Sequence, residues 1–252
     1  MPATRRSGLA IHYELDGSGP PLVLLHGGFT STELWQIDGY VGGLREERQL
    51  ILIDLRGHGR SDKPHEPEAY RLSRLASDVL AVLDEIGLVS AAICGFSLGA
   101  NTALCVAACD PDRVDAVAAI GSDPVAVGFS DLPSEEEDDD PRPLRFEAEG
   151  MGWLVAKLER EGRPARARLV SGADPLAMAA WGRAIVEAIP QRLADLAMPS
   201  LFTWGEREIE GWATPPLPPG ARLLVVPGAD HVGTLERPDL VLPELRSLLA
   251  QV

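Results

Sequence analysis

The segment CGFSLGAN, residues 94–101, places a serine between two glycines, each two positions away from it. An apolar run precedes Ser97 and helix-forming residues follow it, so we expect this serine in a sharp turn between a strand and a helix. Cβ atoms at Gly95 and Gly99 would collide with neighbouring elements in such a turn. The turn exposes the hydroxyl, and the N-terminus of the following helix favours negative charge beside it. The pattern predicts a nucleophilic serine, although a glycine-rich turn before a helix is also common without any catalytic role.

A serine hydroxyl is a weak nucleophile until a base removes its proton, and histidine is the usual base. His231 follows a late apolar run, residues 222–230, and a glycine turn there can bring its ring over the serine. We therefore predict that His231 is the base. The remaining histidines lie in an early alternating strand, two glycine-containing turns and a proline-flanked loop: His12, His26, His58 and His65.

Short apolar runs that alternate with helical patterns must position these residues. Continuous runs rich in Val, Ile and Leu are typical of strands buried on both faces of a parallel sheet. They occupy 21–28, 49–57, 90–97, 114–122, 199–206 and 222–230, and an alternating strand pattern occupies 9–15. Helical periodicity occupies 71–87, 98–109 and 238–252. The sequence therefore predicts an α/β fold with a mostly parallel central sheet flanked by helices.

The stretch from Asp123 to Met198 lacks strand-like runs and contains several helical patterns after an acidic segment. We expect residues 1–122 and 199–252 to form the core domain. Residues 123–198 would form a helical cap, or lid, inserted after the sixth strand of that core. A charge run such as 135–140 is most often a solvated loop, and we expect it to have no chemical role.

Composition excludes several classes of protein. The chain has 252 residues and a formal net charge of −15, which disfavours binding to nucleic acid or to an anionic membrane surface. No run approaches the ~20 apolar residues of a membrane span, and no signal peptide pattern opens the chain, so we expect a cytoplasmic protein. The three cysteines lack histidines at metal-ligand spacing, and we expect no metal site and no cofactor.

Three further segments, together with the Ser97 motif, resemble the α/β-hydrolase superfamily: PLVLLHGGFTSTELW (21–35), DLRGHGRSD (54–62) and GADHVGTLERPD (228–239). The resemblance covers nearly the whole chain and implies an α/β-hydrolase fold with a helical lid after strand 6. Within the superfamily the chain is most similar to the small carboxylesterase, enol-lactonase and cofactor-free haloperoxidase or perhydrolase group. DLRGHGRSD resembles the family's turn after strand 4, and we expect its short polar side chains to tie this turn by local hydrogen bonds. In the family the histidine of the HGG loop usually supports the geometry of its loop.

The resemblance also implies roles for backbone and acidic groups. The backbone N–H groups of Leu98 and Gly28 are expected to form the oxyanion hole, with Phe29 as the alternative to Gly28. The family usually places an acid three residues beyond a glycine after strand 7, and Glu208 lies at that offset from Gly205. The order Ser97, Glu208, His231 matches the family.

The sequence leaves open which residue is the acid of the triad. The gap from Glu208 to His231 is short and contains several prolines. Glu206 and Glu210 are close rivals to Glu208. Asp123 is a different solution, because some family members carry the acid at the end of strand 6.

The implied activity is serine hydrolysis of a small-to-medium, mainly apolar carboxylic ester or lactone, and this small-molecule substrate is the partner we expect. Phe29, Phe96, Trp153 and Trp181 are candidate pocket residues. The same triad also serves C–C bond hydrolases, perhydrolases and lyases, and a non-catalytic ligand-binding protein on this fold is a further alternative. A serine at position 97 excludes haloalkane dehalogenase and epoxide hydrolase chemistry, which use an aspartate there.

Overall fold

The computed structural model describes residues 3–6, 8–122, 142–184, 196–209 and 217–252. Its strands are β1 (Ala3–Arg6), β2 (Leu9–Asp16), β3 (Pro21–Leu25), β4 (Gln49–Ile53), β5 (Ala91–Phe96), β6 (Val114–Ile120), β7 (Ser200–Gly205) and β8 (Arg222–Val226). They form one eight-stranded sheet in the order β1-β2-β4-β3-β5-β6-β7-β8. The β1–β2 and β2–β4 pairs are antiparallel, and every pair from β4 to β8 is parallel.

The helices of the described ranges connect or cover these strands. They are α1 (Glu33–Ile37), α2 (Tyr40–Leu44), α3 (Leu72–Glu85), α4 (Leu98–Cys109), α5 (Arg142–Glu149), α6 (Gly152–Arg160), α7 (Pro164–Ser171), α8 (Pro175–Gly182), α9 (His231–Leu235) and α10 (Pro238–Leu249). Two 3-10 turns, η1 (Pro67–Tyr70) and η2 (Pro111–Arg113), precede α3 and β6.

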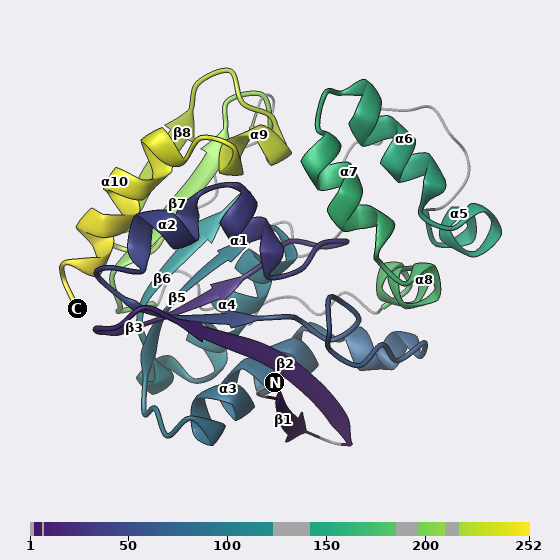
Figure 1. Ribbon diagram of the computed structural model, residues 1–252. Helices are drawn as coiled ribbons and strands as arrows, with labels where there is room; N and C mark the ends of the chain where they lie inside the picture. Colours follow the sequence, from purple (N-terminus) through teal and green to yellow (C-terminus); the bar gives the residue numbers. More distant parts are fainter. Residues whose placement is uncertain (1–2, 7, 123–141, 185–195, 210–216) are drawn as a thin grey trace.

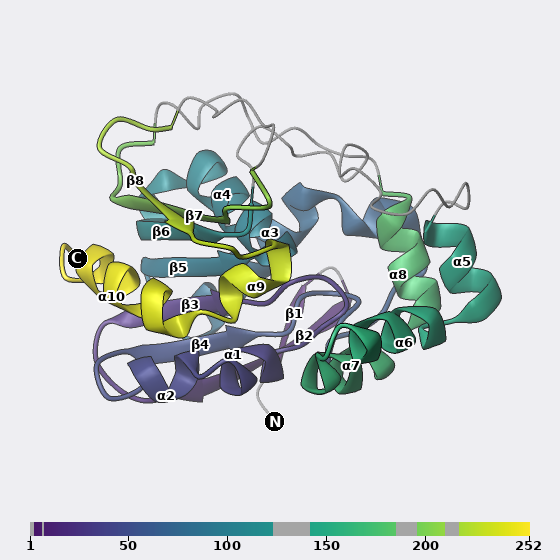
Figure 2. The same ribbon diagram turned by 90° about the horizontal axis from the view of Figure 1, so that it is seen from above.

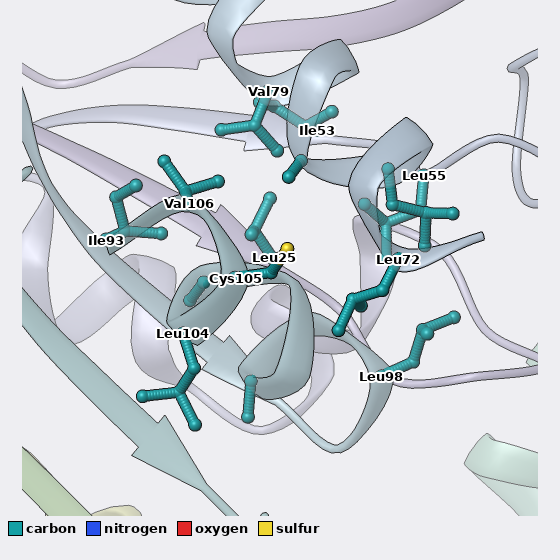
Figure 3. Close-up of a cluster of buried hydrophobic side chains, with 14 of the residues drawn as sticks. Leu25, Ile53, Leu55, Leu72, Val79, Ile93, Leu98, Leu104, Cys105 and Val106 are labelled. Atoms are coloured by element: carbon teal, nitrogen blue, oxygen red, sulfur yellow. The ribbon is translucent and has the colours of Figure 1, made fainter. Parts of the chain in front are cut away.

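Two hydrophobic cores lie on opposite faces of the sheet. Helices α3 and α4 pack on one face, whereas α2 and α10 pack on the other (Figure 2). Figure 3 shows part of the first core, where Leu25, Ile53 and Ile93 of three strands meet Val79 of α3 and Leu104 of α4. Burial of such side chains stabilises the fold by about 1.5–3 kcal/mol each. The continuous apolar strands follow from this arrangement, because a central strand meets a core on both faces.

The parallel strands bring distant segments together at one edge of the sheet. Leu25 pairs with Gly95, and Gly95 pairs with Ala119, so the residues that follow β3, β5 and β6 meet at the carboxyl ends. The segment after β7 joins them, because Thr203 pairs with Ile120. In open α/β sheets this edge is where ligands bind.

Four helices, α5 to α8, form a separate group beside this edge (Figure 1). Helix α5 packs on α8, α6 packs on α7, and α7 touches α1 of the core. They lie between β6 and β7 in the chain, as expected for a helical cap after strand 6. The division of the chain at 122/123 and 198/199 stays a prediction. Asp123 and the acidic run 135–140 lie outside the described residues.

The structure confirms the predicted α/β-hydrolase fold and corrects some local expectations. Strand β8 was expected to be buried on both faces, yet it ends the sheet, and Leu223 is 43% exposed. His231, which was expected to follow a glycine turn, is the first residue of the short helix α9. Helices of five residues, such as α1, α2 and α9, are too short for a periodic pattern to reveal.

Candidate active site

Ser97 occupies the turn between β5 and α4 in a backbone conformation that is rare for residues with a side chain. Its φ is 52° and its ψ is −115°, and its N–H donates to the Ile120 carbonyl at 2.9 Å. Only Phe29 shares a positive φ with it among the non-glycine residues of the described ranges. Such a conformation costs about 1–3 kcal/mol and persists where the surrounding structure enforces it, often at functional sites.

The glycines on either side of Ser97 allow this turn to form. A Cβ on Gly95 would overlap the backbone of Gly99 and Ala100, and a Cβ on Gly99 would overlap the carbonyl groups of Leu25 and His26. The absence of these side chains lets α4 approach the ends of β3 and β5. This close approach presents Ser97 at the carboxyl edge of the sheet.

The groups expected to bind an oxyanion flank Ser97. Leu98 is the first residue of α4, and no side chain caps this helix end, so the first-turn N–H groups and the helix dipole are directed to the region beside Ser97. Gly27 lies on the other side, where an added Cβ would come within 3.4 Å of the Ser97 Cβ. Gly28 follows it and lies directly under the Trp181 indole. The assignment of Leu98 and Gly28 to the oxyanion hole stays a prediction.

His231 lies next to this turn. Its ring stacks on Phe96, the residue before Ser97, with centroids 5.1 Å apart and planes at 30°. A Cβ on Gly121 would lie 3.2 Å from His231 Cε1, so the ring sits beside the residue that follows β6. The His231 side chain is partly exposed.

Glu208 is the acidic residue that reaches His231. Its Oε1 lies 2.6 Å from His231 Nδ1, and its Oε2 accepts a hydrogen bond from the Gly205 N–H at 3.2 Å. The side chain of Glu208 is 5% exposed, against 35% for that of His231. A tight turn after β7, with the Glu208 N–H donating to the Gly205 carbonyl at 3.0 Å, folds the carboxylate back toward the sheet. A carboxylate here holds the proton on Nδ1 and leaves Nε2 as the basic nitrogen.

The rival acids are placed differently. Glu206 is exposed, and its Oε2 accepts a hydrogen bond from the Gly228 N–H at 2.7 Å. Asp123 and Glu210 lie outside the described residues. Of the candidate acids whose position the structure describes, Glu208 is thus the one in contact with His231.

The other buried histidines have structural partners. His26 Nδ1 bonds the Gly27 carbonyl at 2.8 Å, and its Nε2 accepts the Leu55 N–H at 3.1 Å, which fixes the loop after β3. Burial lowers the pKa of His26, and burial together with the neighbouring His26 lowers the pKa of His58 to about 3. Both rings are therefore neutral, and His26 supports its loop as expected.

The turn 54–62 has the structural role that its short polar side chains indicated. Asp54 accepts hydrogen bonds from the N–H groups of Thr32 at 2.8 Å and Arg60 at 2.9 Å, and His12 Nδ1 lies 2.9 Å from its Oδ2. Arg56 forms two hydrogen bonds of 2.7 Å with the buried carboxylate of Asp78. These contacts tie the loop after β3, the turn after β4 and helix α3 together.

Aromatic side chains from the core and the cap meet above the loop after β3. The Phe29 ring lies 5.1 Å from Trp181 and 5.3 Å from Phe146, and Phe146 lies 5.4 Å from Trp153. Three of the predicted pocket residues thus belong to one cluster, and Phe96 lies apart from it against His231. Trp181 covers Gly28, so this cluster forms the wall nearest the expected oxyanion site.

A cavity of about 250 Å³ lies between the loop after β3 and helix α7, and Phe29 is one of its lining residues. Thr32 and Leu169 are among its lining residues, whereas Ser97 and His231 are not. The catalytic candidates are therefore identified by their own contacts and not by this cavity.

Among the residues described here, no three His, Cys, Asp or Glu side chains are grouped to hold a metal ion. No helix in the described ranges is long and apolar enough to cross a bilayer.

Sequence reasoning missed one feature of the site. Arg163, from the cap, binds Asp230, the residue that immediately precedes His231. These residues are 67 positions apart, and no sequence motif links Arg163 to the segment that contains Asp230.

Comparisons with known proteins agree with this architecture. The sequence pattern of the alpha/beta hydrolase fold matches residues 20–169. Pimeloyl-[acyl-carrier protein] methyl ester esterase of Stenotrophomonas maltophilia is 30% identical over an alignment of 270 positions, gaps included, that covers 95% of this chain and 96% of that protein. The crystal structure of the enol-lactonase from Burkholderia xenovorans LB400 has a TM-score of 0.82 and 25% identity, and the match covers 99% of this chain and 100% of that one.

Some relatives match only in part. Mouse epoxide hydrolase 4 is 37% identical over 112 residues, which cover 43% of this chain and 30% of that protein. The chain thus spans about a third of the length of this curated relative. The match to the fold pattern over more than half of the chain, the full-length esterase relative and the shared sheet place this chain in the α/β-hydrolase fold family.

Proposed function

We propose that this protein is a serine hydrolase that cleaves a small-to-medium, mainly apolar carboxylic ester or lactone. The observation that carries the proposal is the contact of 2.6 Å between the buried Glu208 carboxylate and His231 Nδ1, beside a serine held in a strained turn. A nucleophile, a base and an acid that orients the base are the three parts that acyl transfer requires. The esterase and enol-lactonase likenesses support the same class of chemistry.

The proposed reaction begins when Ser97 Oγ attacks the substrate carbonyl carbon. His231 Nε2 takes the hydroxyl proton, and the negative charge of Glu208 stabilises the imidazolium that forms. The N–H groups of Leu98 and Gly28 hold the oxyanion of the tetrahedral intermediate. The intermediate collapses to an acyl-Ser97, and the alcohol leaves with the proton from His231.

A water molecule then completes the cycle. His231 removes a proton from the water as its oxygen attacks the acyl carbon, and a second tetrahedral intermediate forms at the same site. Its collapse returns the proton to Ser97 Oγ and releases the carboxylic acid. A lactone would follow the same steps, with its hydroxyl group retained on the acyl chain.

The aromatic cluster supports an apolar acyl group. Phe29 and Trp181 form an apolar wall beside Gly28, where the acyl carbon would lie. The nearby cap cations have partners: the Arg145 guanidinium lies 4.5 Å above the Trp153 ring, and Arg183 pairs with Glu147. A mainly uncharged substrate fits this environment better than an anionic one.

Ser97 also argues against epoxide hydrolase activity, despite the partial match to mouse epoxide hydrolase 4. That chemistry uses an aspartate at the elbow. C–C bond cleavage, perhydrolysis and lyase chemistry use the same triad, and they remain alternatives to ester hydrolysis. A ligand-binding protein without turnover would keep the pocket and leave the triad idle.

A panel of chromogenic esters and lactones of graded acyl length tests the proposal, with the Ser97→Ala variant as the control. We expect turnover by the parent protein and its loss in Ser97→Ala, since the acyl-enzyme cannot form. Calorimetry on the same compounds measures binding, and so separates a hydrolase from a ligand-binding protein without turnover. Binding with no turnover by the folded parent protein would contradict the hydrolase and favour a ligand-binding protein.

A further inference from the structure

An arginine of the cap binds the residue next to the candidate base. Arg163 precedes α7, and its Nη2 donates to both carboxylate oxygens of Asp230, at 2.8 and 2.9 Å. Its Nε lies 3.3 Å from Glu236 Oε2, beyond the other end of α9. The side chains of Arg163 and Asp230 are 18% and 44% exposed, so water screens this pair partly, and less than it screens a pair in which both side chains are fully exposed.

Asp230 in turn fixes the start of α9. Its Oδ1 accepts the Gly233 N–H at 2.6 Å, which makes Asp230 the N-cap of the helix whose first residue is His231. Its carbonyl accepts the N–H and the hydroxyl of Thr234, both at 2.9 Å. Burial acts to raise the pKa of the Asp230 carboxyl, but hydrogen bonds from Arg163 and Gly233 outweigh it and hold that pKa below its usual range. The carboxylate is therefore charged beside His231.

Arg166 forms a second link between the cap and the same segment. Its Nε donates to Glu236 Oε1 at 2.9 Å, and its Nη2 donates to Asp38 Oδ2 at 2.7 Å. Both Arg166 and Asp38 are nearly buried, with side-chain exposures of 6% and 7%. The cap is thus held at both ends of α9.

Charged groups from the core and the cap lie near His231, either in contact with it or through Asp230. Glu208 approaches from the turn after β7, Asp230 lies immediately before it, and Arg163 approaches from the cap. Glu208 and Asp230 favour the imidazolium, and Arg163 opposes it by neutralising Asp230. Removal of either Arg163 or Asp230 therefore leaves an unbalanced charge beside His231.

We propose that Arg163 is a positioning residue for His231, and that Arg163 and Asp230 form a clamp through which the cap fixes the orientation of the base and balances the charge beside it. The proposal rests on the proposed function of His231 as a catalytic base. Arg163 acts through Asp230 and has no contact with the reacting atoms. Its role is to hold the start of α9 and to balance one charge.

The proposal predicts shifts of opposite sign in the pH dependence of kcat/KM for variants of Arg163 and of Asp230. Arg163→Gln leaves Asp230 uncompensated, so the acid limb of the kcat/KM profile moves to higher pH, by about half a pH unit. Asp230→Asn removes a negative charge beside His231, while Arg163 keeps its contacts with Glu236 and Glu161, so the limb moves to lower pH by a similar amount. The double variant returns the limb to within about 0.2 pH unit of the parent. Arg163→Lys keeps the charge and therefore keeps the limb, while kcat falls about threefold because the paired hydrogen bonds are lost.

The matched control is Arg237→Gln. Arg237 also bonds a carboxylate through two hydrogen bonds, with Asp239 at 2.9 and 2.7 Å, and it lies on the same segment as His231. That pair is confined to the core and more exposed, with side-chain exposures of 42% and 60%. Its loss should leave the acid limb within about 0.2 pH unit of the parent and kcat within about 1.5-fold.

The test combines pH–rate profiles with an NMR titration of the His231 ring, assigned with His231→Gln. The ring titration needs no turnover, so it separates this proposal from the proposed function. Opposite shifts for Arg163→Gln and Asp230→Asn, cancelled in the double variant, would support the clamp. Shifts of the same sign in Arg163→Gln and Asp230→Asn, or no shift in either of these two variants when it is folded, would overturn it even if the parent protein hydrolyses esters. If Arg163→Gln does not fold, Arg163→Lys and Asp230→Asn still decide the outcome, since the clamp requires no shift for the first and a downward shift for the second.

Discussion

Replacement of Glu208 by glutamine changes one atom and removes one charge, and the contacts of this residue determine its effect. Oε1 faces His231 Nδ1 at 2.6 Å, and Oε2 accepts the Gly205 N–H at 3.2 Å. Both oxygens thus serve as acceptors, whereas an amide offers one acceptor and one donor. Glutamine can satisfy only one of the two N–H groups.

Either orientation of the amide is unfavourable. If its NH₂ faces Gly205, two donors meet in a buried site, at a cost of about 1–3 kcal/mol. If its NH₂ faces His231, the ring adopts the tautomer with its proton on Nε2, which cannot accept the Ser97 proton. In both orientations the imidazolium loses its counter-charge. We expect kcat to fall by about 10² to 10⁴, the upper end being the loss known for the same change in a serine protease triad, with KM little changed.

Steady-state kinetics on one chromogenic ester measure this loss. Glu206→Gln is the matched control, because Glu206 also accepts a backbone N–H through one oxygen, from Gly228, but makes no contact with His231. It should keep kcat within about twofold of the parent. Asp123→Asn tests the other acid that the sequence left open. Near-parental turnover in Glu208→Gln together with a large loss in Asp123→Asn would refute the assignment.

Three further predictions concern the turn, the pocket and the cap. Gly99→Ala should lower the free energy of unfolding by about 3 kcal/mol in denaturant titrations, since its Cβ meets backbone carbonyls, whereas Gly42→Ala has open space and should cost nothing. Equal stability of the two variants would contradict the account of the elbow. Trp181→Leu uncovers Gly28 and should raise the ratio of kcat/KM for long over short acyl esters by about tenfold; an unchanged ratio would remove this residue from the pocket. Burial raises the pKa of Asp38 from 3.8 to about 6, so its stabilising contribution is full below pH 3.8 and is lost as pH rises through 6. The unfolding free energy of the parent minus that of Asp38→Asn should therefore fall by about 1–2 kcal/mol between pH 4 and pH 7, and a rise over this range would show that the sign is wrong.

The sequence predicted the elements and residues that a local pattern of neighbouring residues identifies. The strand and helix around Ser97 are recognisable because continuous apolar runs and a glycine-flanked serine are both local signals. The predicted helix 98–109 coincides with α4, and the alternating run 9–15 lies within β2. His231 could be selected for the same reason, since it follows the last strand run.

Features that depend on contacts between distant segments could not be predicted in the same way. Glu206 and Glu208 are two residues apart in one turn, and only the course of the chain after β7 places one inward and the other in solvent. The contact of Arg163 with Asp230 joins the cap to the core, and its two residues have no sequence relation. The prediction that β8 is buried on both faces was wrong for a similar reason, because an apolar run does not show which strand lies at the edge of the sheet.

Covalent labelling with a fluorophosphonate probe, located by peptide mass spectrometry, tests the central claim that Ser97 is an activated nucleophile. The phosphorus atom reacts with an activated serine oxygen in an oxyanion site, and an idle serine stays unmodified. We expect one label on Ser97, none in Ser97→Ala, and labelling slowed by at least tenfold in His231→Ala. A folded parent protein that takes up no label, or a label that persists in Ser97→Ala, would contradict the account.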